Sequence, residues 1–519
     1  MDILSSCLAL LPIVWLVVAL VVLKIPGHWA CVSALVVASV LALTAWGMPP
    51  VDTLTSALEG FASALWPIIL VIIAAIFTYN LTLKTGAMEV IKGMLSGIST
   101  DKRVIILLIG WCFGGFLEGM AGFGTAIAIP ASMLGAMGMN PILACVVCMI
   151  ANVFPTAFGS VGIPTVTLAS VTGLEPLPLA FTTALQMAPF MILVPFLMVA
   201  AGCGGFKALK GVVGITFAAG LSFTIPELVV SCLAGPELTV IVGCVFSLGT
   251  VVLMARARRG KPVPQAYTLD AAAAKTASGA PGMGAVRAWL PFILIFVFLL
   301  LTSKLVPPVN ELLGQFKSTV QISTAAGTTA TSFSWVNTPG IIIFIAAIIG
   351  GLAQKATFPM MGQVLLTTLK QMSRTIITIL SVLAVAKIMA YSGMISDMAN
   401  LFVAITGPFY PFVAPIIAAL GAFVTGSGTS TEVLLGNLQS QAAVAIGASQ
   451  YWLAAANSLG AGLGKVLSPQ CIATAAAAVG LAGQDSALLR AALKWILLML
   501  VLACLVVGLL GAFASNLVG

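Results

Sequence analysis

Residues 118–124 read Glu-Gly-Met-Ala-Gly-Phe-Gly, and residues 425–431 read Thr-Gly-Ser-Gly-Thr-Ser-Thr. Each stretch interrupts a long apolar block near its middle with glycines and polar side chains. Irregular backbone inside a membrane leaves N–H and C=O groups unpaired, so it persists only where neighbouring protein or a water-filled cavity satisfies those groups. The two stretches therefore predict the tips of two re-entrant hairpins that meet within a membrane protein.

The composition of the whole chain supports a membrane protein. Of its 519 residues, 61% are hydrophobic and only 7% are charged, whereas a soluble domain is about 25% charged. So few charges exclude a soluble enzyme and a nucleic-acid-binding protein, and the apolar content excludes a disordered chain. The sequence contains no metal-binding cluster, catalytic triad or cofactor motif, so we predict no metal site, no cofactor and no enzymatic activity.

The apolar residues fall into blocks of about 20 residues, the length that crosses a bilayer core as a helix. We predict an all-α polytopic membrane protein with about 12 transmembrane helices plus two re-entrant hairpins, arranged in two inverted repeats. The predicted spans cover residues 5–23, 29–46, 61–83, 141–172, 178–201, 211–230, 238–254, 288–303, 339–354, 375–391, 451–483 and 487–512.

The two halves of the chain share a pattern of polar interruptions. Asn152 and Pro164 of the first half recur at the same spacing as Asn457 and Pro469 of the second. Inverted repeats with interrupted helices at the bilayer midplane are typical of secondary transporters. We therefore predict a first repeat, two linking spans, a basic cytoplasmic linker and a second repeat. These regions cover residues 1–205 (with hairpin 104–139 and broken helix 141–172), 206–254, 255–287 and 288–519 (with hairpin 401–448 and broken helix 451–483).

The positive charges indicate the orientation of the chain. Nearly all of the 22 Lys and Arg residues fall on one side of the predicted topology, and loops rich in these residues stay in the cytoplasm. Both termini are then predicted to lie outside. The first hairpin enters the membrane from the cytoplasm and the second from outside, which makes the two repeats inverted.

The interruptions predict a binding site for a small anion. Glycines such as Gly122 and Gly124 let the backbone turn and approach a ligand closely, and a helix that starts after a break presents free N–H groups and a positive dipole end. Two further irregular segments are predicted at 154–159 and 460–465. The alternative explanation for glycine-rich membrane segments is close helix packing.

The ionisable residues Glu118, Glu432, Lys387 and Lys465 lie within the predicted membrane segments. Intramembrane charges are costly, so a functional role is their default interpretation. Lys465 is expected either to neutralise a substrate carboxylate or to form a structural ion pair with Glu118 or Glu432. Glu118 is expected either to carry a coupling proton, since burial disfavours a charged carboxyl, or to stay ionised beside a lysine. Lys387 either joins the site or reaches the membrane surface.

Five motifs in the two halves together resemble the L-lactate permease family of bacterial secondary transporters. They are Glu-Gly-Met-Ala-Gly-Phe-Gly-Thr at 118–125, Ala-Asn-x-x-Pro-x-Ala-Phe-Gly at 151–159, Gly-Ile-Pro at 162–164, Ala-Ala-Asn at 455–457 and Gly-Lys-Val-Leu-Ser-Pro-Gln at 464–470. The resemblance implies import of L-lactate, and often of D-lactate and glycolate, by proton symport across the bacterial inner (cytoplasmic) membrane. It also implies kinship with the wider ion-transporter superfamily, in which some members couple to sodium and move dicarboxylates.

One stretch departs from the family pattern. The second hairpin of the family usually reads Thr-Gly-Ser-Asp-Thr-Ser-Ser-Asn, whereas this chain has Gly428 in place of that Asp and Glu432 in place of that Asn. Either Glu432 substitutes for the missing acid or Glu118 acts alone as the proton carrier. Sodium-coupled carboxylate transport, and an anion channel lined by the same breaks, remain alternative functions.

The expected partners are a small 2-hydroxy monocarboxylate, a coupling proton and the lipid bilayer, with no nucleic acid; the oligomeric state is left open. Asn152 and Asn457 either bind the substrate hydroxyl or cap backbone groups freed by the breaks. Glu118 and Glu432 are the proton-coupling candidates. The substrate-binding candidates are Gly122, Gly124, Asn152, Ser427, Thr429, Ser430, Thr431, Asn457, Lys465 and Gln470.

Overall fold

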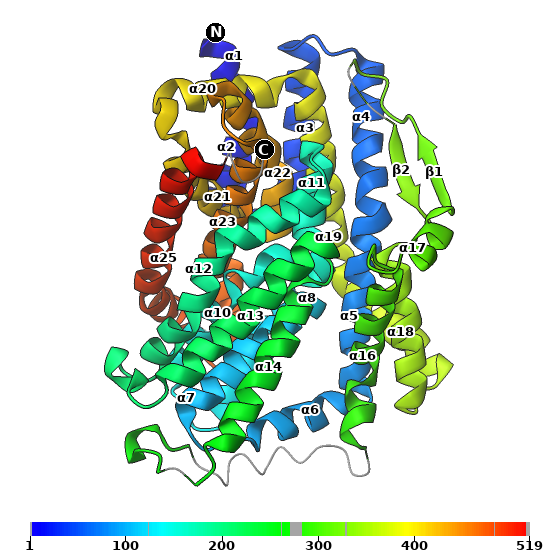
Figure 1. Cartoon of the computed structure of the whole chain (residues 1–519). Coiled ribbons are helices and arrows are strands. Elements are labelled where there is room, and N and C mark those ends of the chain that lie inside the picture. Colours follow the sequence, from blue (N-terminus) through cyan, green and yellow to red (C-terminus); the bar gives the residue numbers. More distant parts are fainter. Residues whose placement is uncertain are drawn as a thin grey trace.

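The computed structural model describes residues 3–514 apart from residues 123, 261, 270–282, 327, 329 and 482 (Figure 1). Helices make up nearly all of this described part, and one antiparallel pair of strands accompanies them. The elements up to residue 257 are α1 (Ile3–Ala9), α2 (Leu11–Val17), η1 (Val18–Val22), α3 (Gly27–Thr44), α4 (Pro50–Ser63), η2 (Ala64–Ile69), α5 (Leu70–Lys84), α6 (Ala87–Ser96), α7 (Lys102–Ile105), η3 (Ile106–Phe113), α8 (Gly114–Met120), α9 (Thr125–Ala136), α10 (Pro141–Asn152), η4 (Pro155–Phe158), α11 (Gly159–Thr172), α12 (Pro176–Gly202), η5 (Phe206–Leu209), α13 (Val213–Leu233) and α14 (Thr239–Ala257). The later elements are η6 (Gln265–Tyr267), α16 (Ala285–Thr302), α17 (Pro307–Gly314), β1 (Lys317–Val320), β2 (Thr331–Ser334), α18 (Pro339–Ala353), α19 (Phe358–Ser392), α20 (Met394–Thr406), η7 (Gly407–Phe409), α21 (Tyr410–Thr425), α22 (Gly428–Ile446), α23 (Gln450–Leu467), α24 (Pro469–Ala478) and α25 (Asp485–Ala514).

The membrane-spanning helices confirm the predicted class. Within the described residues, 10 helices are long and apolar enough to cross a bilayer, or 11 when the bent pair at 141–172 is taken as one span. Two of the ten, Lys102–Met120 and Met394–Thr425, cover the first arms of the predicted hairpins, and the predicted span 451–483 is not among them. The predicted span 339–354 is α18, which is shorter than the other spans, and the predicted span 5–23 is divided among α1, α2 and η1.

The first predicted hairpin, 104–139, contains α8 and α9, which are separated between Met120 and Thr125. The second, 401–448, contains α21 and α22, which are separated at residues 426–427. Both separations fall where the sequence predicted the tips. The inverted relation of the two halves and the re-entrant nature of the hairpins remain predictions.

The first broken helix bends by 58° between α10 and the segment that continues into α11. Before the break, the side chain of Asn140 accepts a hydrogen bond from the amide of Leu143, and Pro141 opens α10, a combination that favours a helix start. After it, Ser160 and Val161 have φ of 44° and 59°. A β-branched residue in this left-handed region is uncommon, so the predicted interruption at 154–159 is real and extends beyond it.

The segment 460–465 is helical, contrary to the prediction of an irregular backbone there, because it lies inside α23. Its glycines serve packing instead: a Cβ at Gly460 or Gly464 would overlap the carbonyl oxygen of Pro415 or Ala419 in α21. Close helix packing and helix breaks both use glycine, so the pattern alone did not separate them. The break comes at Ser468, whose side chain caps α24 by accepting from the amide of Cys471 at 3.2 Å.

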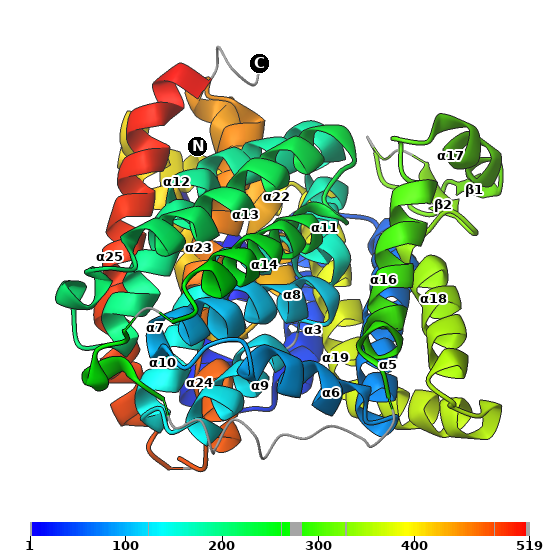
Figure 2. The ribbon, with the colours of Figure 1, turned by 60° about the horizontal axis from the view of Figure 1, so that its bottom comes forward.

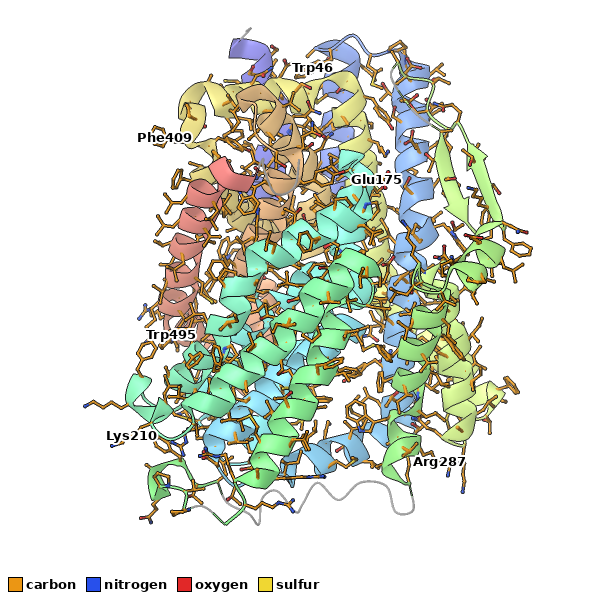
Figure 3. All side chains as sticks on the ribbon, in the orientation of Figure 1. Trp46, Glu175, Lys210, Arg287, Phe409 and Trp495 are labelled. Carbon is orange, nitrogen blue, oxygen red and sulfur yellow. The ribbon has the colours of Figure 1, made fainter. Side chains whose placement is uncertain are left out.

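The two ends of the molecule can be identified from residues labelled in Figure 3. Lys210 and Arg287 lie at one end, and Trp46, Glu175 and Phe409 lie at the other (Figure 3). We call these the Lys210 end and the Trp46 end. Helix α19 runs from one to the other, since Gln354 just before it bonds to the carbonyl of Arg287, and Asp397 just after it accepts from Trp46.

Helices from distant parts of the chain form two groups. Figures 1 and 2 show α4, α5, α16 and α18 together at one side, and α12, α13, α23 and α25 at the other. Helix α19 packs on α3 and α4 and also reaches α22 of the second hairpin. The second hairpin therefore lies next to α19.

Candidate functional site

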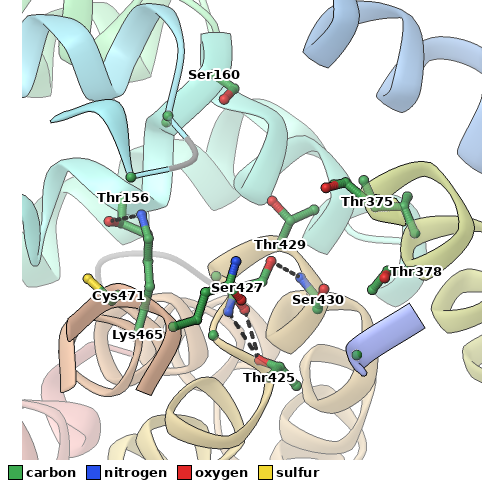
Figure 4. Close-up of a pocket in the computed structure, with 18 of the residues that line it drawn as sticks. Thr156, Ser160, Thr375, Thr378, Thr425, Ser427, Thr429, Ser430, Lys465 and Cys471 are labelled. Atoms are coloured by element: carbon green, nitrogen blue, oxygen red, sulfur yellow. Dashed lines mark hydrogen bonds between the residues drawn. The ribbon is translucent and has the colours of Figure 1, made fainter. Parts of the chain in front are cut away.

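A cavity of about 440 Å³ lies where the two hairpin tips, the first broken helix and α19 meet (Figure 4). Its walls combine hydroxyl, amide and charged side chains with glycine backbone. The lining residues are Pro26, Gly27, His28, Glu118, Gly122, Gly124, Thr156, Gly159, Ser160, Pro164, Arg374, Thr375, Thr378, Ile379, Thr425, Gly426, Ser427, Gly428, Thr429, Ser430, Lys465, Gln470, Cys471 and Thr474.

The first tip turns through two glycines in the left-handed region, Gly122 with φ of 61° and Gly124 with φ of 83°. A side chain at Gly122 would meet the hydroxyl of Ser160 at 2.5 Å. That hydroxyl donates to the carbonyl of Ala121 at 2.9 Å and so satisfies a backbone group freed by the turn. Phe123, within the same predicted stretch, lies outside the described residues.

The second tip is a helix start. Gly426 ends α21 with φ of 69°, and the Ser427 side chain caps α22 by accepting from the amide of Ser430 at 3.2 Å. Gly428 and Thr429 of the first turn line the cavity. The positive end of α22 thus opens at the cavity, an arrangement suited to an anion.

A buried ion pair forms the deep wall. Lys465 Nζ lies 2.8 Å from Glu118 Oε1 and donates to Thr156 Oγ1 at 3.0 Å, and Asn152 Nδ2 donates to Glu118 Oε2 at 2.9 Å. Glu118 is 2% exposed and Lys465 8%. Both carboxylate oxygens and the ammonium group therefore have partners, which is what charges at this depth require. The sequence left two roles open for Lys465, and the structure shows the ion pair with Glu118.

Asn152 does not line the cavity; its side chain contacts the Glu118–Lys465 pair instead. Its side chain also lies 3.4 Å from the ammonium group of Lys465. The structure brings together eight of the predicted residues at the cavity wall. They are Glu118, Gly122, Gly124, Ser427, Thr429, Ser430, Lys465 and Gln470.

Glu432 and Asn457 lie behind the second tip. Asn457 Nδ2 donates to Glu432 Oε2 at 2.7 Å, the same asparagine-to-glutamate bond that Asn152 makes to Glu118 in the first half. Neither residue lines the cavity, and Thr431 is also buried away from it, with its hydroxyl donating to the carbonyl of Ser427. The structure places these three predicted residues beneath the site.

Lys387 does not reach the cavity. Its ammonium group pairs with Glu59 at 2.7 Å, and the hydroxyl of Tyr391 donates to the same Glu59 oxygen at 2.8 Å. This second buried pair joins α19 to α4.

Several lining residues were not predicted from the sequence. Arg374, Thr375 and Thr378 come from α19, and His28, the one histidine of the chain, comes from the start of α3. Arg374 and His28 stand at the edges of predicted spans, where a charge is ordinarily a topology signal. Nothing local distinguishes them from other such residues, because their place in the wall depends on how α19 and α3 pack.

Comparisons with known proteins match nearly the whole length of the chain. The family described as L-lactate permease matches residues 5–513. An L-lactate permease of Streptococcus iniae is 43% identical over 452 residues, covering 87% of this chain and 93% of that protein. The glycolate permease GlcA of Escherichia coli (strain K12) is 36% identical over 527 residues, covering 95% and 93%.

A solved structure supports the fold. The MtrF protein of Neisseria gonorrhoeae, described as one of a class of antimetabolite efflux pumps, superposes with a TM-score of 0.51 at 13% identity. The superposition covers 92% of this chain and 94% of that one.

Proposed function

Because the chain belongs to the L-lactate permease family, we propose that it imports L-lactate, and also D-lactate and glycolate, by proton symport across the bacterial inner membrane. The observation that carries the coupling mechanism is the Glu118–Lys465 ion pair in the cavity wall. Both partners lie beside the hydroxyls and the helix start that would hold a small hydroxy acid.

The ion pair sets up a competition for Lys465. While Glu118 is ionised, its carboxylate occupies the ammonium group at 2.8 Å. A proton on Glu118 removes that negative charge and leaves a buried ammonium group without a counter-ion, which is unfavourable. A substrate carboxylate then takes the place of the glutamate charge, so that proton binding and anion binding promote each other.

The substrate orientation follows from the chemistry of the two walls. The carboxylate meets Lys465 and the positive end of α22, and the 2-hydroxyl meets Ser427 or Thr429. One proton and one monoanion together add no charge, so the loaded protein crosses between states without moving net charge through the low-dielectric core. After release, Glu118 ionises and pairs again with Lys465.

The cavity opens toward the cytoplasm in this proposal. Helix α3 has 18 residues, about 27 Å of helix, and ends near Trp46, so His28 in its first turn lies toward the Lys210 end. That end carries the basic residues that mark the cytoplasmic side. Both termini are then periplasmic, and import involves movement of the hairpin cores relative to the group that contains α4 and α19.

Uptake by the purified protein in proteoliposomes tests the function. We expect labelled L-lactate to accumulate under an imposed pH gradient, with D-lactate and glycolate competing, and replacing sodium by choline to have no effect. Loss of uptake in choline would favour sodium coupling instead. Absence of counterflow with labelled lactate would favour a channel, since only a carrier exchanges substrate in this way.

A further inference from the structure

We propose that Arg374 is the carboxylate-binding residue of the cytoplasmic mouth, which holds the substrate anion between Lys465 and the cytoplasm. This inference rests on the proposed function and adds a second anion position to it. The residue lies on α19, whose Thr375 and Thr378 lie across the cavity from Lys465 (Figure 4).

The charges of the cavity support this role. The lysine, arginine and glutamate residues that line it are Lys465, Arg374 and Glu118. Lys465 is committed to Glu118 at 2.8 Å, whereas no ion pair among the described residues includes Arg374. In the ionised resting state, the attraction for an anion at this cavity therefore comes from the guanidinium group and from the positive end of α22.

The position of Arg374 on its helix places it at the mouth. The residue is exposed, and α19 begins at the Lys210 end, so Arg374, the first of its lining residues, is the one nearest that end. Toward the Trp46 end, Thr375, Thr378 and Ile379 of the same helix continue the cavity wall. An anion that leaves Lys465 for the cytoplasm passes these residues first and Arg374 last.

The surroundings suit a small hydroxy acid. Thr375 and Thr378 face Thr429 and Ser430 of α22 near this mouth (Figure 4). A guanidinium group offers two parallel N–H donors that match the two oxygens of a carboxylate. Hydroxyls on both sides are available to the 2-hydroxyl of the substrate while Arg374 holds its carboxylate.

A topology anchor is the other explanation of this arginine, and the chain contains a matched control for it. Lys370 lies one helical turn earlier on α19, is exposed, and does not line the cavity. If Arg374 acted only by its charge at the membrane surface, removing either charge would have the same effect.

Transport kinetics measured separately from each side test the proposal. Lactate exchange is measured in inside-out and right-side-out membrane vesicles for the wild type, Arg374→Gln, Arg374→Lys and Lys370→Gln. We expect Arg374→Gln to raise the KM at the cytoplasmic face about tenfold, the worth of one charge-assisted hydrogen bond, with the KM at the outer face unchanged. Arg374→Lys should recover part of the loss, and Lys370→Gln should behave as the wild type.

A second measurement does not depend on any variant. Phenylglyoxal modification of the wild-type protein, read by peptide mass spectrometry, should be slowed by lactate at Arg374 but not at Arg490, an exposed arginine outside the cavity. An unchanged cytoplasmic KM in Arg374→Gln, an equal rise in Lys370→Gln, or no protection of Arg374 would overturn the inference. A wild-type protein that exchanges no lactate would instead overturn the proposed function.

Discussion

Lys465 Nζ lies 2.8 Å from Glu118 Oε1, although the two residues are 347 positions apart in the chain. The contact joins α23 of the second half to the first hairpin at the wall of the shared cavity. Asn152 completes the group by donating to the second carboxylate oxygen. In the proposed mechanism, the charge on Glu118 decides whether Lys465 is free to receive another anion.

Replacing Glu118 by Gln tests the proton step. A glutamine keeps the shape of the side chain but cannot ionise, so Lys465 stays available to the substrate at every pH. We expect Glu118→Gln to reduce accumulation driven by a pH gradient at least about tenfold, within the usual range of coupling between two ligands, and to retain lactate counterflow. Loss of counterflow as well would show that Glu118 is needed for binding rather than for coupling.

Replacing Glu432 by Gln separates the two candidate proton carriers. Glu432 lies away from the cavity, is 1% exposed, and is bonded to Asn457. We expect Glu432→Gln to keep gradient-driven accumulation within about twofold of the wild type, because coupling requires differential interaction with the transported anion. The same proteoliposome assay measures it, and a loss as large as that of Glu118→Gln would transfer the carrier role to Glu432.

Replacing Gly464 by Ala tests the packing of α23 on α21. The added methyl group would overlap the carbonyl oxygen of Ala419, and backbone cannot yield as a flexible side chain does. We expect a loss of about 1–3 kcal/mol in stability, seen as a lower melting temperature in detergent. Gly249→Ala in α14 is the control, since a methyl group there meets nothing within 4 Å; a melting temperature for Gly464→Ala as high as for this control would refute the packing argument.

Replacing Lys387 by Met tests the second ion pair. The change leaves Glu59, which is 1% exposed, without its cationic partner. Breaking a buried pair from one side costs about 3–5 kcal/mol, so we expect a marked fall in melting temperature, partly reversed in the double variant Glu59→Gln, Lys387→Met. The KM for lactate of the double variant should match the wild type; a large rise would place this pair in the transport site.

Much of the fold was predictable because its signals are local. The length of an apolar block decides whether a helix spans the bilayer, and the left-handed glycines at 122 and 124 and the cap at Ser427 mark local breaks. The segment 460–465 shows the limit of such reasoning. Its glycines allow α23 to pack closely against α21. A sequence pattern does not distinguish glycines that permit a helix break from glycines that permit close packing of two helices.

The site was predictable in part. Hydroxyls and glycines at the two tips reach one cavity as expected, and so do Glu118 and Lys465. Arg374 and His28 line the cavity but were not predicted, because each lies at the edge of a predicted span with no local feature that distinguishes it. Glu432 and Asn457 resembled site residues in sequence, yet the turn of α22 and α23 directs them behind the tip.

The sequence alone determined that the chain is a helical membrane protein and where its helices are interrupted. The reason is that the length of an apolar segment and the presence of helix-breaking residues act locally along the chain. Only the tertiary structure decided which buried charges pair, Lys465 with Glu118 and Lys387 with Glu59. An ion pair depends on distance in space, and packing of helices hundreds of residues apart sets that distance. The same packing brings α19 to the hairpin tips and so makes Arg374 part of the cavity.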